Sequence, residues 1–136
     1  MAVIQLSTTV RNARLGAYEA TIGPAPVLRM YSGPLPADCA ATATGDLLVE
    51  MTLPSDWLTA PAGGSVSMLG TWQDASADAA GKLGYYRILD AGGATCHEQG
   101  DITLTGGGGA MTVDNTDVAP TQKVTVTSFI RTDGNA

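Results

Sequence analysis

The chain has 136 residues, of which 44% are hydrophobic and 15% are charged, with a formal net charge of −6. That length suits one domain with its own core, and the acidic excess disfavours nucleic-acid binding, because such proteins neutralise phosphates with Lys and Arg. No apolar run is long enough to cross a bilayer, and the N-terminus "MAVIQLSTTVRNARLG" lacks the features of a signal peptide. We therefore expect no membrane partner, and a protein made in the cytoplasm that stays there or leaves without a signal.

One helix is predicted before Gly23. Three residues can cap its start: Ser7, Thr8 and Thr9. Its apolar face is formed by residues at i, i+3 and i+7, namely Leu15, Tyr18 and Ile22. Gly23 followed by Pro24 predicts its end, since glycine accepts the left-handed conformation and proline cannot continue a helix. Gly16 costs about 1 kcal/mol relative to alanine, so we expect the helix to need a packing surface, on its own domain or on a partner.

Beyond Pro26 the hydrophobic period changes to that of β-strands. Seven segments have the pattern of strands: 27–33, 47–53, 65–70, 83–89, 95–104, 111–116 and 123–132. Short strands with Gly- and Pro-rich turns and no helices between them predict a mainly β fold, an antiparallel β-sandwich of jelly-roll type with one short N-terminal helix. We divide the chain into a helical arm, residues 1–26, and a β-sandwich domain, residues 27–136. The segment "LPSDWLTA" is expected to form one helical turn that places Trp57 in the core.

The run of four glycines, Gly106–Gly109, raises the question of a nucleotide site. A phosphate-binding glycine loop is followed by a helix, whose free amides face the anion. Here the segment "AMTVDNT" follows, which has the pattern of a strand, and no lysine lies near. We expect a flexible turn between strands and no nucleotide cofactor.

Few residues suit catalysis or metal binding. The only histidine is His97, and with Cys39 and Cys96 it supplies at most three zinc ligands, without the usual spacing. The sequence has no G-x-S-x-G nucleophile motif, and Glu98 beside His97 is expected to be solvated. Two carboxylate pairs suit turns better than calcium sites: Asp74 with Asp78, and Asp114 with Asp117. We therefore expect no catalytic residue, no cofactor, no metal and no enzymatic activity.

Cys39 and Cys96 leave two alternatives. A compact β domain can bring the two residues together, and a disulfide that closes so long a loop would stabilise the fold by several kcal/mol. In a protein folded in the cytoplasm, two reduced and buried thiols are the alternative.

The charge is unevenly placed along the chain. Residues 1–37 hold three basic residues and one acidic residue, giving +2, and the remainder holds four basic and twelve acidic residues, giving −8. One interpretation is an acidic surface that only keeps the protein soluble. The other is a basic N-terminal face, with Arg11, Arg14 and Arg29, that docks on an acidic partner.

Five phrases in order carry a family resemblance: "LSTTVRNARLGAYEATIG", "LRMYSGPLPADCAA", "GDLLVEMTLPSDWL", "GTWQDASADAAGKLGYYRILDAGG" and "TCHEQGDITLTGGGGAMTVDNTDVAPTQKVTVTSF". Together they span nearly the whole chain. The series resembles a family of small β-rich proteins encoded by tailed bacteriophages. The most distinctive parts are the hairpin "YRILDAGG", the strand "MTVDNT" and the closing "VTVTSF".

The resemblance implies a jelly-roll-like β domain without enzymatic chemistry, in a virion structural protein that decorates (cements) the capsid surface. Its partners would be the major capsid protein and other copies of itself. A place in the tail or fibre is the alternative, including a module that recognises a host glycan, and a small hydrolase dependent on His97 is a further rival. From the charge and the helix, we expect the partner contact at six residues: Arg11, Arg14, Leu15, Tyr18, Ile22 and Arg29.

Overall fold

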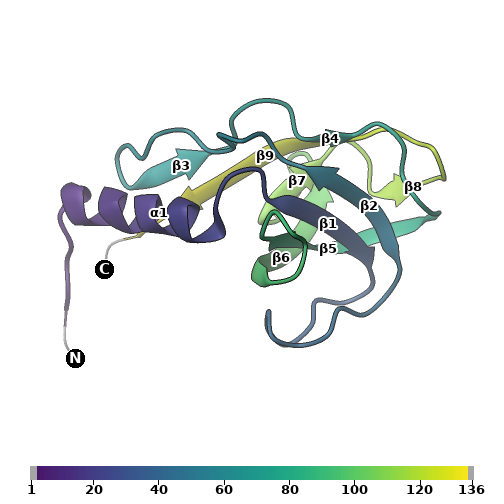
Figure 1. Cartoon of the computed structure of the whole chain (residues 1–136), viewed down its shortest axis with the longest axis horizontal. Helices are drawn as coiled ribbons and strands as arrows, with labels where there is room; N and C mark the ends of the chain where they lie inside the picture. The colour runs from purple at the N-terminus through teal and green to yellow at the C-terminus, as the bar shows by residue number, and fades with distance from the viewer. Residues whose placement is uncertain (1–2, 135–136) are drawn as a thin grey trace.

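The computed structural model describes residues 3–134, so the ends of both segments assigned above, residues 1–2 and 135–136, lie outside it. Within this range one helix precedes nine strands (Figure 1). Their bounds are α1 Thr8–Ile22, β1 Val27–Ser32, β2 Leu47–Thr52, β3 Ser65–Ser67, β4 Gln73–Asp74, β5 Gly81–Leu89, β6 Cys96–Leu104, β7 Met111–Val113, β8 Asp117–Val118 and β9 Val124–Thr132. The predicted β-rich class with one N-terminal helix is confirmed.

The strands form one curled sheet, open along one side like half a barrel (Figure 1). Its order is β2-β1-β5-β6-β7-β9-β3, with β4 added to β9 and β8 added to β5. All the strand pairs are antiparallel except β6–β7, which is parallel. The layout therefore differs in detail from the expected antiparallel sandwich, because one continuous mixed sheet curls around the core.

The parallel pair explains the four glycines. Parallel neighbours usually need a crossover of about a dozen residues or more, yet Ile102 of β6 pairs with Met111 of β7. The chain turns back within residues 105–110, where Gly106 and Gly108 have positive φ angles of 84° and 82°. A Cβ on Gly107 would lie 2.7 Å from the Thr103 side chain. The run is a turn, as predicted, and at Gly107 and Gly109 it packs too closely on Thr103 of β6 for a side chain.

The helix begins and ends where the sequence predicts. The Ser7 side chain accepts a hydrogen bond from the Val10 amide, and the Gly23 amide donates to the Glu19 carbonyl. Trp57 is fully buried and donates from Nε1 to the Gly23 carbonyl at 3.1 Å. The segment around Trp57 is a bend and an isolated bridge, so the predicted placement of Trp57 in the core is confirmed but the predicted helical turn is wrong.

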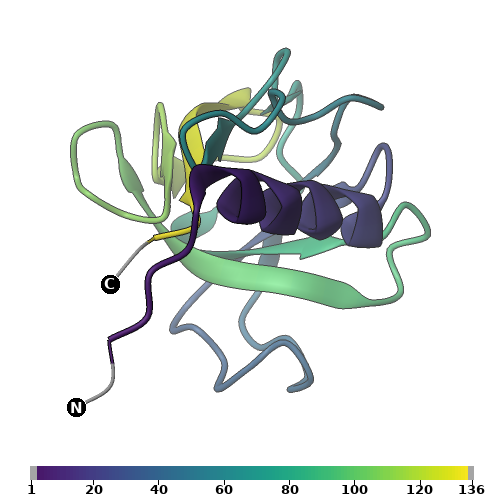
Figure 2. The same ribbon diagram turned by 90° about the vertical axis from the view of Figure 1, so that its left-hand side faces the viewer.

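The core lies between the concave face of the sheet and α1, which crosses beside β3 and the end of β9 (Figures 1 and 2). Aromatic side chains run through it in a continuous row: Tyr18, Trp57, Trp72, Phe129 and Tyr86. Leu15 and Ile22 of α1 are buried in the same cluster. The helix is therefore part of the domain's core.

Candidate functional site

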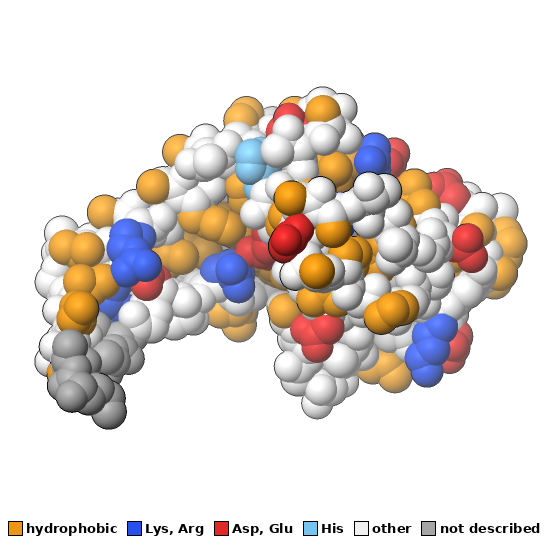
Figure 3. All heavy atoms as spheres, turned by 90° about the horizontal axis from the view of Figure 1, so that it is seen from below, with side chains coloured by type: hydrophobic (Ala, Val, Ile, Leu, Met, Phe, Trp, Pro, Cys, Tyr) orange, Lys and Arg blue, Asp and Glu red, His pale blue; other side chains and the backbone are white. Residues whose placement is uncertain are grey.

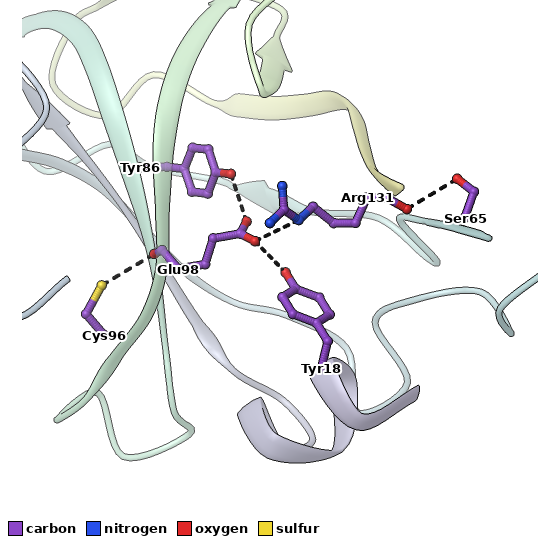
Figure 4. Close-up of polar contacts among 6 residues, drawn as sticks. All are labelled: Tyr18, Ser65, Tyr86, Cys96, Glu98 and Arg131. Atoms are coloured by element: carbon purple, nitrogen blue, oxygen red, sulfur yellow. Dashed lines mark hydrogen bonds and ion pairs between the residues drawn. The ribbon is translucent and has the colours of Figure 1, made fainter. Parts of the chain in front are cut away.

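A buried carboxylate joins the helix to the sheet. Glu98 of β6 is only 7% exposed. Its Oε1 accepts a hydrogen bond from Tyr18 Oη at 2.8 Å and pairs with Arg131 Nε at 2.9 Å, and its Oε2 accepts from Tyr86 Oη at 2.8 Å (Figure 4). We call these four residues the Glu98 cluster. Three donors from α1, β5 and β9 thus converge on one carboxylate of β6.

Strand register places the cluster. Glu98 stands opposite Ile88 of β5, and directly opposed residues share a face, so its side chain points toward the core. Tyr86 stands opposite Gly100, where an added Cβ would lie 2.8 Å from the tyrosine ring. The absence of a side chain at Gly100 lets this ring lie along β6 and reach Glu98.

The charges in the cluster favour hydrogen bonding over proton transfer. Burial, followed by the negative charge of Glu98, raises the pKa of both Tyr18 and Tyr86 far above the usual phenol range. Both phenols therefore remain protonated donors at neutral pH. The Arg131 guanidinium balances the carboxylate and lies 5.7 Å from the centre of the Tyr18 ring. A carboxylate occupied by three donors is a poor general base, and these phenols are poor nucleophiles.

Two shallow hollows flank the cluster along α1. One, of about 270 Å³, is lined by Arg14, Ala17, Tyr18, Thr21, Ile22 and His97. The other, of about 240 Å³, is lined by Arg14, Leu15, Tyr18, Arg131, Thr132 and Asp133. His97 thus faces the helix. Across residues 3–134, no group of three or more His, Cys, Asp or Glu side chains is placed to hold a metal ion.

Glu98 corrects one prediction. We expected a solvated neighbour of His97, but this side chain is buried. The period-two alternation of β6 could have predicted that Glu98 is buried, because it places Glu98 on the same face as the buried Ile102. An isolated charge on a buried face needs partners, and the hydroxyl of Tyr18, which lies 80 positions earlier, is one of them.

The predicted partner contacts are mostly occupied within the domain. Leu15 and Ile22 are buried in the core, which corrects their assignment as anchors for a partner: an apolar helix face beside an open sheet is covered by that sheet first. Tyr18 is held by Glu98. The arginines also have partners: Arg11 donates to the Asp133 carbonyl at 2.6 Å, Arg14 pairs with the Asp133 carboxylate at 3.0 Å, and Arg29 pairs with Glu50 at 2.6 Å.

An exposed apolar segment was missed from the sequence. Residues 3–7 extend away from the β domain before α1 begins (Figures 1 and 2). Val3 is 73% exposed and Ile4 69%, and Val10, in the first turns of the helix, is also exposed. Figure 3 shows hydrophobic side chains beside Lys and Arg side chains at this end of the molecule. The run "AVI" carries this signal in the sequence, just before the residues that predicted the helix and the basic face.

The comparisons with known proteins add no neighbour: no family model, no curated protein and no solved structure matched the chain. Within residues 3–134 no helix is long and apolar enough to cross a membrane. Cys39 and Cys96 are free thiols, each partly exposed.

Proposed function

We propose that the protein is a bacteriophage virion structural protein that binds the outer surface of the major capsid protein shell, decorates it and stabilises it. The five phrases quoted above support this role through their resemblance to small β-rich virion proteins. The Glu98 carboxylate, whose oxygens already accept from three donors, fits a binding protein better than an enzyme.

The observation that carries the proposal is the exposed apolar segment next to α1. Large apolar side chains that project singly are common, but two adjacent ones on an extended segment offer a surface for a protein partner. Val3 and Ile4 are each more exposed than the exposed large apolar side chains of the β domain, of which Ile130 at 60% is the highest. Their burial in a groove of the shell would contribute roughly 1.5–3 kcal/mol for each side chain.

The basic residues contribute less to this contact. Arg14 is 59% exposed and already pairs with Asp133, and exposed ion pairs are worth about 0–1 kcal/mol. A shell presents the same groove many times, so a modest contact at each position suffices for dense decoration, especially when neighbouring copies also touch. The short outer strand β3, at the end of the sheet beside α1, offers an edge for such contact between copies.

The test uses purified particles of the phage that encodes the protein. We expect electron microscopy to locate copies across the capsid surface. The doubly substituted protein, Val3→Ser with Ile4→Ser, should rebind stripped particles at least about tenfold more weakly than the unmodified protein, because two apolar contacts are lost. Leu35→Ser is the matched control, since Leu35 is also exposed but lies in the loop between β1 and β2.

Three outcomes would overturn parts of the proposal. Copies confined to one vertex would mean the tail or fibre role. Particles without the protein would reject the virion role altogether. Full rebinding of the doubly substituted protein would leave the virion role intact and remove the apolar segment as its attachment point.

A further inference from the structure

The face of the sheet that points away from the core has its own cover. In β5, Tyr86 and Ile88 belong to the core, so the alternate residues Tyr85, Arg87 and Leu89 point to the other face. These three are nevertheless buried. The chain between β1 and β2, residues 33–46, lies over them and is called the cover segment below.

Side chains of the sheet hold the cover segment at several points. Arg87 Nη2 donates to the carbonyls of Asp38 at 3.2 Å and Ala41 at 2.8 Å. Gln99 Nε2 donates to the Pro36 carbonyl at 2.8 Å. Farther along the segment, the Tyr85 hydroxyl bonds both the amide and the carbonyl of Thr44, at 3.0 and 2.6 Å. The segment is therefore fixed against β5 and β6 on both sides of Cys39.

Cys96 lies beneath this part of the cover segment. It stands opposite Leu89 at the start of β6, so it shares the outer face with Leu89 and Arg87. Cys39 falls between the two carbonyls that Arg87 holds. Cys39 therefore lies beside Cys96, whose titration it influences, and Cys96 Sγ donates to the Glu98 carbonyl at 3.4 Å.

We propose that Cys39 and Cys96 are a disulfide-forming site, in which thiol–disulfide exchange with a low-molecular-weight disulfide bonds the cover segment covalently to β6. The geometry explains why a mixed disulfide formed at one cysteine would be resolved by the other cysteine rather than by a second molecule. The cover segment is anchored on both sides of Cys39, and β6 fixes Cys96, so the two sulfur atoms meet without a search of the chain. This site is independent of the proposed virion role.

The exchange has two steps, and Cys39, in the outer cover segment, starts it. Burial raises the pKa of the Cys96 thiol to about 12, so Cys96, beneath that segment, keeps its proton at neutral pH until the second step. The Cys39 thiolate attacks oxidised glutathione, forming a mixed disulfide and releasing one glutathione thiolate. Cys96 then loses its proton to water and attacks the Cys39 sulfur, releasing the second glutathione. Two thiols and one glutathione disulfide thus give one protein disulfide and two glutathione molecules. The positive charge of Arg87 favours the transient Cys96 thiolate.

The test equilibrates the full chain in a buffer of reduced and oxidised glutathione, followed by acid quenching and counting of thiols in denaturant. We expect monomers with no reactive thiol, and digestion without reductant should release one peptide pair that joins residues 39 and 96. Cys39→Ser and Cys96→Ser are the matched controls, and each should stop at a single free or glutathione-bound thiol. The oxidised protein should melt about 10 °C above the reduced one, because the disulfide closes a long loop.

A second measurement separates the built site from chance pairing. The same buffer with denaturing urea should lower the ratio of protein disulfide to mixed disulfide by about tenfold or more, since an unfolded loop brings the thiols together only at millimolar effective concentration. Two thiols that persist in the folded protein, disulfide formed only between molecules, or an equal ratio with and without urea would each overturn the proposal.

Discussion

Replacing Glu98 by Gln tests whether one buried carboxylate holds the helix to the sheet. The substitution keeps the shape of the side chain and one oxygen acceptor, but it removes the negative charge on which Tyr18, Tyr86 and Arg131 converge. Hydrogen bonds to charged groups contribute about 1.5–3 kcal/mol each. A Gln side chain can still form hydrogen bonds with the hydroxyls of Tyr18 and Tyr86, but these would be weaker because the acceptor has no charge. The Arg131 partner is 44% exposed, so loss of the ion pair itself adds little. We expect a loss of about 2–3 kcal/mol in the free energy of unfolding.

The assay is urea unfolding followed by tryptophan fluorescence, because Trp57 and Trp72 are both fully buried and Trp57 contacts Tyr18 of the cluster. With a urea slope of about 2 kcal/mol per molar for a domain of this size, the midpoint should fall by about 1 M. A domain with about 5–15 kcal/mol of stability remains folded after such a loss. Glu98→Ala should cost more, about 3–5 kcal/mol, since it leaves the largely buried hydroxyls of Tyr18 and Tyr86 without their acceptor.

Glu50→Gln is the matched control. Glu50 makes the same kind of pair, with Arg29 at 2.6 Å, but on the exposed surface between β1 and β2. Its loss should cost about 0–1 kcal/mol. If the two Gln variants unfold at the same urea concentration, the Glu98 cluster contributes no more than a surface ion pair, and the reasoning fails.

Two further predictions concern alkaline pH and the glycine turn. Because the folded pKa values of Tyr18 and Tyr86 lie above the unfolded value of 10.0, the unfolded state loses these protons first. The stability that these two groups contribute should therefore be constant below pH 10 and fall as pH rises beyond it. Tyr18→Phe with Tyr86→Phe should flatten the fall above pH 10 in urea titrations, and an unchanged slope would show that other groups cause it. Gly107→Ala places a methyl group 2.7 Å from the Thr103 side chain and should lower the free energy of unfolding by about 1–3 kcal/mol. Gly92→Ala is the control and should not lower it, because the nearest atom to its added methyl group lies at 3.8 Å. Equal melting temperatures for the two variants would mean that the turn has room to relax.

Local patterns in the sequence predicted the elements but not how they meet. The helix boundaries follow from a cap and a stop signal that lie next to it, at Ser7 and Gly23, and the long strands follow from their alternation. The two-residue strands β4 and β8 are too short to have a period, so no pattern in the sequence predicts them. The parallel pairing of β6 with β7 was also missed, since alternation looks the same in either direction.

The candidate site was harder to predict for a related reason. Tyr18 and Glu98 were both singled out, one as a partner anchor and the other as a solvated carboxylate. Their contact joins residues 80 positions apart, and the sequence around each residue does not predict it. The helix face showed a similar ambiguity, because Leu15 and Ile22 would have the same spacing whether they covered their own sheet or another protein. Whether the helix face is covered by its own sheet or by another protein depends on how the sheet curls, and that curl depends on the whole chain.

The short return between β6 and β7 also affects the order in which contacts can form. Ile102 and Met111 are nine positions apart (111 − 102), whereas Val27 and Leu89, which pair between β1 and β5, are 62 apart (89 − 27). The entropy lost on closing a loop grows with its length, and distant pairings slow folding. Parallel pairing is usually among the most distant in a chain, but here it is among the most local. The close-packed turn at Gly107 and Gly109 thus makes a parallel pairing short in sequence, and we expect β6 and β7 to pair before β1 and β5 do.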